Sequence, residues 1–314
     1  MKILVTGGAG FIGRWVVDQL LKDNHQVWVL DDLSNGRREN LETFYQDKNF
    51  MDLVVGDIKD QHILNLLFNQ KFDICFHLAA SINVQDSIDD PKTTFENDVI
   101  GTFNVLEQCR IHSVKMVFMS TCMVYQQADG SEGISEKNPA KPASPYAGSK
   151  LAAENMCLSY YHSYGLPITV IRPFNTYGPY QKTGGEGGVV AIFLKNKLAG
   201  QPVNIYGSGN QTRDLLFVED CARFIVKAGY TDQVNGEIVN AGLGEDISIN
   251  KLAELIVDDQ SRIKHIQHIH PQSEIPRLVC DYQKAKRLLD WNPSYSLKEG
   301  IKKTESWIQS TNLI

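Results

Sequence analysis

Short apolar runs alternate along the first half of the chain with longer segments in which apolar residues recur every three or four positions. The runs lie at 2–6, 26–30, 51–57, 72–80 and 114–121. The segments of helical period stand between them, at 11–22, 61–69 and 93–112. Strands and helices that alternate in this way predict an α/β fold, a Rossmann-type doubly wound parallel sheet with helices on both faces.

The second half of the chain loses this regular alternation after the apolar run at 167–173. Loops rich in glycine and proline follow, as at 178–190, and a capped helix is predicted at 246–256. We therefore expect a smaller C-terminal lobe that binds the substrate. The predicted division is a Rossmann domain of 1–172 plus about 211–240, and a second lobe of about 173–210 and 241–314.

Composition disfavours several classes of protein. The 314 residues carry a net charge of -6, so we expect no nucleic-acid partner. Six cysteines occur without a C-x-x-C pair, which is typical of reduced thiols in a cytoplasmic protein. We also expect no membrane segment and no signal peptide, because no apolar run approaches the roughly 20 residues that span a bilayer.

The sequence TGGAGFIG follows the first strand and begins the first helix. Gly7, Gly10 and Gly13 have the spacing G-x-x-G-x-x-G. This spacing allows a tight turn, a close backbone approach and a pyrophosphate at the helix N-terminus. A glycine turn without a ligand is the alternative interpretation.

Acidic residues at the ends of the next two strands predict the contacts of a dinucleotide's adenosine half. Asp31 lies about 20 residues beyond the glycines, where a carboxylate meets the ribose 2′-hydroxyl. An acid there disfavours a 2′-phosphate, so NAD is predicted over NADP. Arg37 and Arg38 weaken this inference, but we interpret them as part of a solvated loop. Asp57, in the motif GDI, is expected beside the adenine amino group.

Tyr146 and Lys150 in SPYAGSK have the spacing Y-x-x-x-K, which places both side chains on one face of a helix. A nearby ammonium lowers the pKa of a phenol, so Tyr146 is a candidate general base near neutral pH. Taken alone, the spacing also fits an ordinary surface pair on a helix.

Together with HLAA and RPFNTYGP, these motifs resemble the extended short-chain dehydrogenase/reductase family, in particular its nucleotide-sugar epimerases and dehydratases. The resemblance covers Met1 to about Trp307. It implies NAD as the cofactor and a UDP-linked nucleotide sugar as the substrate. It also implies a homodimer in which helices near 93–112 and 146–164 pack into a four-helix bundle.

The resemblance also assigns roles to individual residues. Tyr146 takes the proton of the sugar 4-hydroxyl while NAD accepts the C4 hydride, Thr121 hydrogen-bonds the same oxygen, and Lys150 binds the nicotinamide ribose. The implied cofactor contacts are Gly7, Gly10, Phe11, Ile12, Gly13, Asp31, Asp32, Asn35, Asp57, Ile58, Leu78, Ala79, Ala80, Asn97, Lys150 and Phe174. The implied substrate contacts are Met123, Asn175, Val189 and Arg213.

Two departures from the family pattern bear on the reaction. The late arginine motif appears as PQSE at 271–274, so its phosphate arginine is missing, and Arg277 is the candidate substitute. Glucose-type 4,6-dehydratases carry Asp and Glu after the catalytic Thr, whereas this chain carries Cys122 and Met123. The standard pair of carboxylates is therefore absent, and the thioether of Met123 cannot transfer a proton in place of one. The glucose-type 4,6-dehydratase reaction is disfavoured for this reason.

STCMVY, SYYHSYGLP and RPFNTYGPYQKTGGEGGVV resemble the 5,6-dehydratases of UDP-N-acetylglucosamine. In those enzymes the 4-keto intermediate loses the C5 proton and the C6 hydroxyl, and the hydride then returns to C4. We predict this reaction, with Cys122 as the proton-transfer group, its pKa lowered by neighbours, and Met123 shaping the pocket around C6. The alternatives are a UDP-hexose or UDP-N-acetylhexosamine 4-epimerase in which Cys122 is a small buried apolar residue, a 4,6-dehydratase, and a non-catalytic NAD sensor.

Three further features are weaker candidates for a role. His265, His268 and His270 suggest a metal site, but no carboxylate or Cys stands at a partner spacing, so no metal is predicted. His77 is expected in the wall of the cofactor pocket. The glycine-rich segment 183–188 is either a lid over the sugar or a connecting loop.

Overall fold

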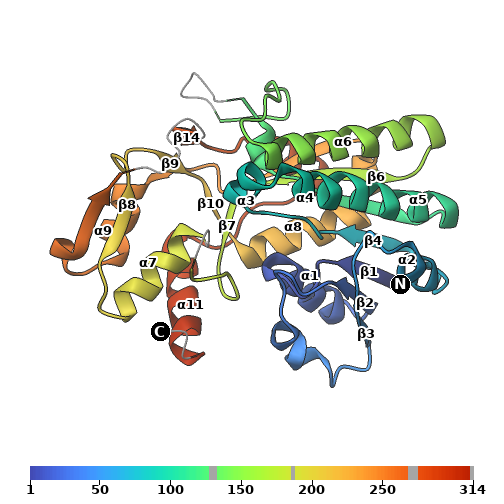
Figure 1. Ribbon diagram of the computed structural model, residues 1–314, viewed down its shortest axis with the longest axis horizontal. Coiled ribbons are helices and arrows are strands. Elements are labelled where there is room, and N and C mark those ends of the chain that lie inside the picture. Colours follow the sequence, from blue (N-terminus) through green and yellow to red (C-terminus); the bar gives the residue numbers. More distant parts are fainter. Residues whose placement is uncertain (127–132, 185–187, 268–274, 312–314) are drawn as a thin grey trace.

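The molecule consists of a large sheet domain with a smaller lobe beside it (Figure 1). The structure is a computed structural model that describes residues 1–126, 133–184, 188–267 and 275–311. The smaller lobe is made by segments from the second half of the chain, which leave the sheet domain after its sixth strand.

Seven parallel strands form the central sheet, in the order β11-β6-β5-β4-β1-β2-β3. Their bounds are β1 (Lys2–Thr6), β2 (Gln26–Asp31), β3 (Phe50–Val55), β4 (Ile74–His77), β5 (Lys115–Met119), β6 (Ile168–Pro173) and β11 (Ile238–Ala241). The chain builds outward from β1 in one direction and from β4 in the other. The predicted Rossmann-type fold is therefore confirmed, and its switch point lies between β1 and β4, where ligands bind in such sheets.

Alternate strand residues face two different layers of helices. In β1, Ile3 and Val5 join one apolar core, whereas Leu4 belongs to the other. The first core is completed by α1 (Phe11–Lys22) and α8 (Val218–Tyr230), and the second by α2 (Gln61–Phe68), α5 (Thr102–His112) and α6 (Pro145–Tyr164). Figure 1 shows α5 and α6 on one side of the sheet and α1 and α8 on the other. Burial on both faces explains why the strands are nearly continuous apolar runs.

The helix predicted at 93–112 is divided into three parts. After α3 (Val84–Asp89) comes α4 (Pro91–Phe95), which is followed by the π-helix η2 (Glu96–Gly101) and then by α5. The side chain of Asp98 is buried within the π-helix, where its Oδ1 accepts a hydrogen bond from Ser81 N–H at 2.7 Å. A single turn of different pitch leaves the apolar period almost unchanged, so the sequence pattern does not reveal it.

The smaller lobe has its own apolar core, to which α7, α9 and α11 contribute. Its helices are α7 (Val189–Leu198), α9 (Ile249–Ile256) and α11 (Leu297–Ser310). Its strand pairs are β7 (Asn175–Tyr177) with β10 (Leu215–Phe217) and β8 (Val203–Tyr206) with β13 (Ile263–Ile266), while β9 (Thr212–Arg213) lies between β12 (Ile247–Ser248) and β14 (Arg277–Leu278). The predicted helix at 246–256 begins at Ile249, because Ser248 caps it by accepting a hydrogen bond from Lys251 N–H at 3.2 Å.

The last segment of the chain contributes to both parts of the molecule. The helix α10 (Gln283–Leu289) packs against β11 and α8 of the sheet domain, whereas α11 packs against α7 of the smaller lobe. Short helical turns complete the structure at η1 (Arg38–Phe44), η3 (Cys122–Val124), η4 (Asp232–Val234) and η5 (Gln260–Arg262).

Candidate active site

The glycine-rich turn between β1 and α1 lies in a pocket at the switch point of the sheet. Gly7 has a φ of +71°, and a Cβ atom on it would lie 2.7 Å from the backbone nitrogen of Ala79. A Cβ atom on Gly13 would lie 2.0 Å from the carbonyl oxygen of Gly7. Glycine is therefore needed at both positions. The N-terminus of α1, which begins at Phe11, borders the pocket and favours an anion there.

The pocket brings together most of the residues predicted to contact the cofactor. It is lined by Gly7, Gly10, Phe11, Ile12, Gly13, Asp31, Asp32, Asn35, Asp57, Ile58, Leu78, Ala79, Ala80 and Asn97. Of the predicted set, only Lys150 and Phe174 are not part of this lining. The donors and acceptors present fit a dinucleotide, since a helix N-terminus suits the pyrophosphate and carboxylates suit ribose hydroxyls.

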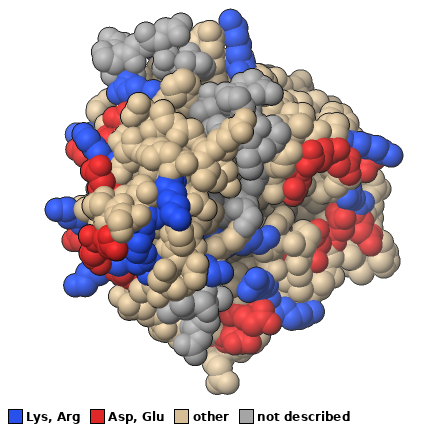
Figure 2. All heavy atoms as spheres, turned by 60° about the vertical axis from the view of Figure 1, so that its left-hand side comes forward, with Lys and Arg blue, Asp and Glu red and all other residues tan. Residues whose placement is uncertain are grey.

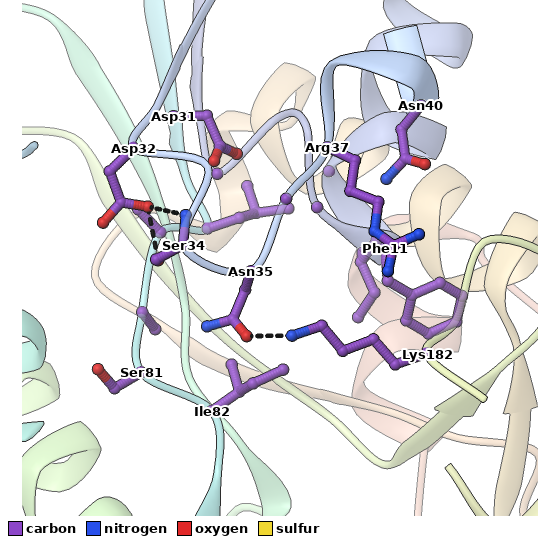
Figure 3. A pocket seen from close by; sticks show the side chains of 18 of the residues that line it. Phe11, Asp31, Asp32, Ser34, Asn35, Arg37, Asn40, Ser81, Ile82 and Lys182 are labelled. Carbon is purple, nitrogen blue, oxygen red and sulfur yellow. Dashed lines mark hydrogen bonds between the residues drawn. The ribbon is translucent and has the colours of Figure 1, made fainter. Parts of the chain in front are cut away.

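The end of β2 brings two carboxylates to this pocket (Figure 3). Asp31 accepts hydrogen bonds from Ala9 N–H and Leu33 N–H, both at 2.9 Å. Burial nevertheless raises the pKa of Asp31. Asp32 Oδ1 accepts from the backbone N–H of Ser34 at 2.9 Å and from its hydroxyl at 2.6 Å. Both oxygens of Asp31 and the Oδ2 atom of Asp32 can each accept a further hydrogen bond, as a contact with a ribose hydroxyl requires.

Asn97 is held by a polar chain on the other side of the pocket. Its Nδ2 donates to Ser81 Oγ at 2.9 Å, and its Oδ1 accepts from Lys59 Nζ. Lys59 Nζ also lies 3.4 Å from Asp57, the predicted adenine contact. Asn97 and Asp57, two predicted cofactor residues, are thus connected through Lys59. A cofactor that hydrogen-bonded the side chain of Asn97 would have to replace its bond to Ser81 or its bond to Lys59.

Several residues of the pocket carry little or no signal in the sequence. Arg37, which we interpreted as solvated, lines the pocket, and so does Asn40, whose Nδ2 donates to Ala9 O at 2.8 Å. Tyr180, Lys182 and Trp307 reach the pocket from the smaller lobe. The positions of these three residues in the pocket depend on how the smaller lobe packs against the sheet domain, and the order of residues along the chain does not reveal that packing.

The catalytic candidates Thr121 and Tyr146 come from two elements beyond the carboxyl end of β5. Thr121 caps η3, where its Oγ accepts from Met123 N–H at 3.2 Å. Tyr146 lies in the first turn of α6, which Ser144 caps. Both side chains are buried, with 8% of each residue exposed. The Thr121 hydroxyl acts on the phenol of Tyr146 and favours its ionised form.

Burial, followed by the charge of Asp98, raises the pKa of Tyr146 well above its usual range. The hydrogen bond with Thr121 acts in the opposite direction but does not outweigh burial. The prediction that Lys150 brings the pKa of Tyr146 near neutrality is therefore wrong for the protein alone. The physical reason is desolvation, because a phenolate loses more hydration on burial than a phenol does.

Lys150 lies one turn further along α6 and is only 2% exposed. Its Nζ atom lies 4.4 Å from the ring centroid of Phe118, a cation–π contact. Burial lowers the pKa of Lys150, while the negative charges of Asp98 and Glu154 raise it. Asp98 was not singled out by the sequence, because an acid at this spacing looks like any surface residue of a helix.

Cys122 follows Thr121 directly and is 3% exposed. Burial raises the pKa of its thiol to about 12, although the positive charge of Arg213 acts to lower it. The prediction that neighbours lower this pKa is therefore wrong, and the thiol is protonated at neutral pH. The charge that Cys122 would carry as a thiolate raises the pKa of Tyr146.

An apolar cluster surrounds the thiol. Cys122 packs with Val124, Phe174 and Cys280, and Met123 lies against this cluster while remaining partly exposed. Phe174 thus belongs to the same apolar cluster as Cys122 and not to the lining of the dinucleotide pocket. Its predicted contact with the cofactor has no support from that lining.

The remaining substrate candidates lie on the smaller lobe. Asn175 begins β7, and its buried Oδ1 has no hydrogen-bond partner within the described chain. Such an atom is a natural place for a donor on a ligand. Arg213, on β9, donates from Nη1 to the carbonyl oxygens of Thr212 and Ile275, both at 2.8 Å, and its charge reaches Cys122. Val189 begins α7 and is half-buried.

Arg277 does not share a face with Arg213. In the pairing of β14 with β9, Arg277 is opposite Thr212, and Leu278 is opposite Arg213. Paired residues point to the same face of a sheet and successive residues alternate, so the two arginines point to opposite faces. Arg277 Nε instead donates to Asp246 Oδ2 at 3.1 Å. The geometry disfavours Arg277 as the substitute phosphate arginine, and the segment 271–274 lies outside the described residues.

His77 is fully buried and is not part of the pocket wall, contrary to expectation. Its ring nitrogens hydrogen-bond Thr6 Oγ1 at 2.6 Å and Thr102 Oγ1 at 3.0 Å. Its place at the end of an apolar strand explains this burial. Thr183 and Gly188 at the ends of the glycine-rich segment line the dinucleotide pocket, whereas 185–187 lie outside the described residues.

The remaining candidate features add no second site. In the described ranges, which omit His268 and His270, no group of three or more His, Cys, Asp or Glu side chains could hold a metal ion. All six cysteines are buried and free. None of the helices in the described ranges combines the length and the apolar character needed to cross a bilayer.

Known proteins are similar to this chain in sequence and in backbone structure. The family model described as GDP-mannose 4,6 dehydratase matches residues 4–304. A UDP-glucose 4-epimerase of Mycolicibacterium smegmatis is 38% identical over 99% of each chain. The X-ray structure of Pal from Bacillus thuringiensis superposes with a TM-score of 0.97 and 65% identity, covering 99% of this chain and 100% of that one. The structure of the UDP-glucose 4-epimerase of Thermus thermophilus in complex with NAD has a TM-score of 0.89 and 34% identity, covering 98% and 99%. This chain belongs to that family, the nucleotide-sugar epimerases and dehydratases of the extended short-chain dehydrogenase/reductase type.

Proposed function

We propose that the protein is an NAD-dependent enzyme that dehydrates a UDP-linked sugar, with UDP-N-acetylglucosamine as substrate and a 5,6-ene as product. The observation that carries this proposal is the buried group of Thr121, Cys122 and Tyr146, of which the first two closely follow Met119, a lining residue of the dinucleotide pocket. Relatives whose names include UDP-glucose support the uridine nucleotide, and the NAD in one of their structures supports the cofactor.

The first step is oxidation at C4 of the sugar. Bound NAD supplies the acceptor for the hydride. Tyr146 takes the proton of the 4-hydroxyl, Thr121 donates a hydrogen bond to the same oxygen, and Lys150 provides a buried positive charge that favours the phenolate. Because the pKa of Tyr146 is raised in the protein alone, we expect this proton transfer only when cofactor and sugar have changed its surroundings.

The second step uses the thiol of Cys122 twice. The neighbouring C4 carbonyl makes the C5 proton acidic, and the electron pair of the C5–H bond forms the C5–C6 double bond as the C6 hydroxyl departs. In the same step the thiol gives its hydrogen to that hydroxyl, which leaves as water, and the sulfur takes the C5 proton. Arg213 stabilises the transient thiolate, since its charge already acts on Cys122. Tyr146 would give its proton back to the C4 oxygen when the hydride returns to C4, so no external oxidant would be consumed.

Proton NMR of the purified protein with UDP-N-acetylglucosamine and NAD tests the reaction. We expect two new exocyclic vinyl signals. Cys122→Ala should then lower their rate of appearance by about 10²–10⁴-fold, the usual effect of removing one proton-transfer group, while NAD stays bound. Vinyl signals that form at the wild-type rate in Cys122→Ala would remove the thiol from the mechanism.

A 4-epimerase is the second candidate function. It is favoured by the relatives named UDP-glucose 4-epimerase and by the apolar cluster around Cys122, in which a thiol can act as a small buried side chain. In that case the same NMR experiment would show a hexosamine with an inverted C4 proton and no vinyl signals. Cys122→Ala would then retain most of the activity.

We further propose a homodimer located in the cytoplasm. The helical stretch of α4, η2 and α5 exposes large apolar side chains, with Phe95 48%, Ile100 42% and Phe103 38% accessible. Burial of this face against a second copy would remove it from water. Six free thiols are typical of a reducing compartment.

A further inference from the structure

A lysine of the smaller lobe spans the dinucleotide pocket and touches the sheet domain. Figure 3 shows the side chain of Lys182 extended beside Phe11 with its end at Asn35. Lys182 Nζ donates to Asn35 Oδ1 at 2.6 Å. Asn35 belongs to the loop after β2, and Lys182 to the segment between β7 and α7. This hydrogen bond therefore joins the two lobes across the place where a dinucleotide must lie.

The backbone that carries Lys182 is firmly anchored. Pro179 O accepts a hydrogen bond from Trp15 Nε1 at 3.1 Å. The Tyr180 ring lies 4.3 Å from the Arg14 guanidinium and 5.1 Å, between ring centroids, from Trp307. Tyr180 also has a φ of +72°, a conformation that a non-glycine residue adopts only when its surroundings impose it. Only the flexible side chain of Lys182 is then left to adjust to a ligand.

The pocket lining contains few positive charges that could bind the phosphates of a dinucleotide. Among the described residues of the lining, Arg37 and Lys182 are the cations, and three carboxylates, Asp31, Asp32 and Asp57, oppose them. A dinucleotide adds two phosphate charges near the N-terminus of α1. An ammonium on a four-carbon stem is suited to follow those charges, because its three donors have no fixed plane.

We infer that Lys182 is a cofactor-binding residue supplied by the smaller lobe, whose ammonium group passes from Asn35 to the phosphate oxygens of the bound dinucleotide. The cofactor thereby joins the two lobes, and its release requires this contact to break. The inference rests on the proposed function only for the identity of the dinucleotide, NAD. It concerns binding and makes no use of the sugar reaction.

Lys182→Met tests this role, because it keeps the length of the stem and removes the charge. Lys251→Met is the matched control, since Lys251 is an exposed lysine of α9 outside the pocket lining. After removal of any co-purified nucleotide, calorimetry gives the dissociation constants of NAD, ADP-ribose and adenosine. We expect Lys182→Met to weaken NAD and ADP-ribose at least tenfold, about 1.4 kcal/mol, with adenosine unchanged. Stopped-flow dilution should show faster release of NAD, and the control should match the wild type.

Three outcomes would overturn the inference. Affinities for NAD and ADP-ribose within twofold of the wild type would show that Lys182 contributes nothing. Tighter binding would show that its bond to Asn35 competes with the cofactor. An equal loss for adenosine would show that the effect does not arise at the phosphates. Because no sugar is present, inactivity toward UDP-N-acetylglucosamine would refute the proposed function and leave this result standing.

Discussion

The buried carboxylate of Asp98 acts on the charge of Lys150, and we expect it to lower the free energy of unfolding at neutral pH. Its carboxylate is fully buried, Oδ1 accepts from Ser81 N–H, and Oδ2 has no partner in the described part of the chain. Burial raises its pKa to about 6, although Lys150 acts to lower it. Asp98→Asn removes the charge and keeps both the shape and the oxygen that Ser81 needs.

The raised pKa fixes the sign and the size of the expected effect. Folding favours the protonated carboxyl group of Asp98, so its contribution to stability is present below the ordinary pKa of 3.8 and is lost as the pH rises through about 6. A shift of about two units corresponds to ~3 kcal/mol. This figure already includes the attraction between Asp98 and Lys150. Part of it is offset in the variant, because the position of Oδ2, which has no partner in the described chain, becomes an N–H donor without an acceptor. We therefore expect Asp98→Asn to raise the free energy of unfolding by about 1–2 kcal/mol at neutral pH and by nothing near pH 4.

Urea unfolding of the wild type and Asp98→Asn across this pH range measures the difference. Asp52→Asn, at an exposed position of β3, controls for net charge. Asp98→Asn should also affect catalysis: without Asp98 the pKa of Lys150 falls further, so the alkaline limb of the pH profile moves to lower pH. A variant that is no more stable than the wild type at neutral pH, with NAD still bound, would refute this reasoning.

Three further predictions test the site, the core and the assembly. Tyr146→Phe should lower turnover of the sugar nucleotide by about 10²–10⁴-fold while the nucleotide content measured after gel filtration is unchanged. Glu154→Gln should cost about 3–5 kcal/mol in urea unfolding, because it leaves the buried guanidinium of Arg172, now 2.8 Å from the Glu154 carboxylate, without a countercharge. Phe103→Glu should give a monomer in sedimentation velocity where the wild type sediments as a dimer, because it places a charge on the apolar face of α5.

Local chemistry explains what the sequence predicted well. The spacing of Gly7 and Gly13 reflects contacts between neighbouring segments, and Asp31 is fixed by its place at the end of an apolar strand. Tyr146 and Lys150 are one helical turn apart, so their shared face follows from the helix itself. Features that depend on a few adjacent residues are thus encoded within one stretch of the chain.

Features that depend on long-range packing were missed or misjudged. Lys182 and Trp307 enter the cofactor pocket only because the smaller lobe packs beside it. Arg277 was expected near a phosphate, but its direction depends on the parity of a two-residue strand, which apolar patterning does not fix. The pKa of Tyr146 was expected to fall because its sequence neighbour is a cation, whereas the burial that decides it comes from the whole fold.

The raised pKa of Cys122 changes the chemical role of the thiol without removing it from the mechanism. A thiol with a pKa near 12 holds its proton at neutral pH. It is therefore a poor base in the resting protein. As its proton passes to the leaving oxygen, however, the sulfur gains the character of a thiolate that is a stronger base than an ordinary one and is better able to take a proton from carbon. A pair of carboxylates divides these tasks between an acid and a base, whereas a single buried thiol exchanges its own proton for the C5 proton within one elimination step, so Met123 need not transfer a proton. A thiol that acts in its protonated form also predicts that the elimination step does not become faster between about pH 6 and 9, in contrast to a thiolate that must form before the reaction.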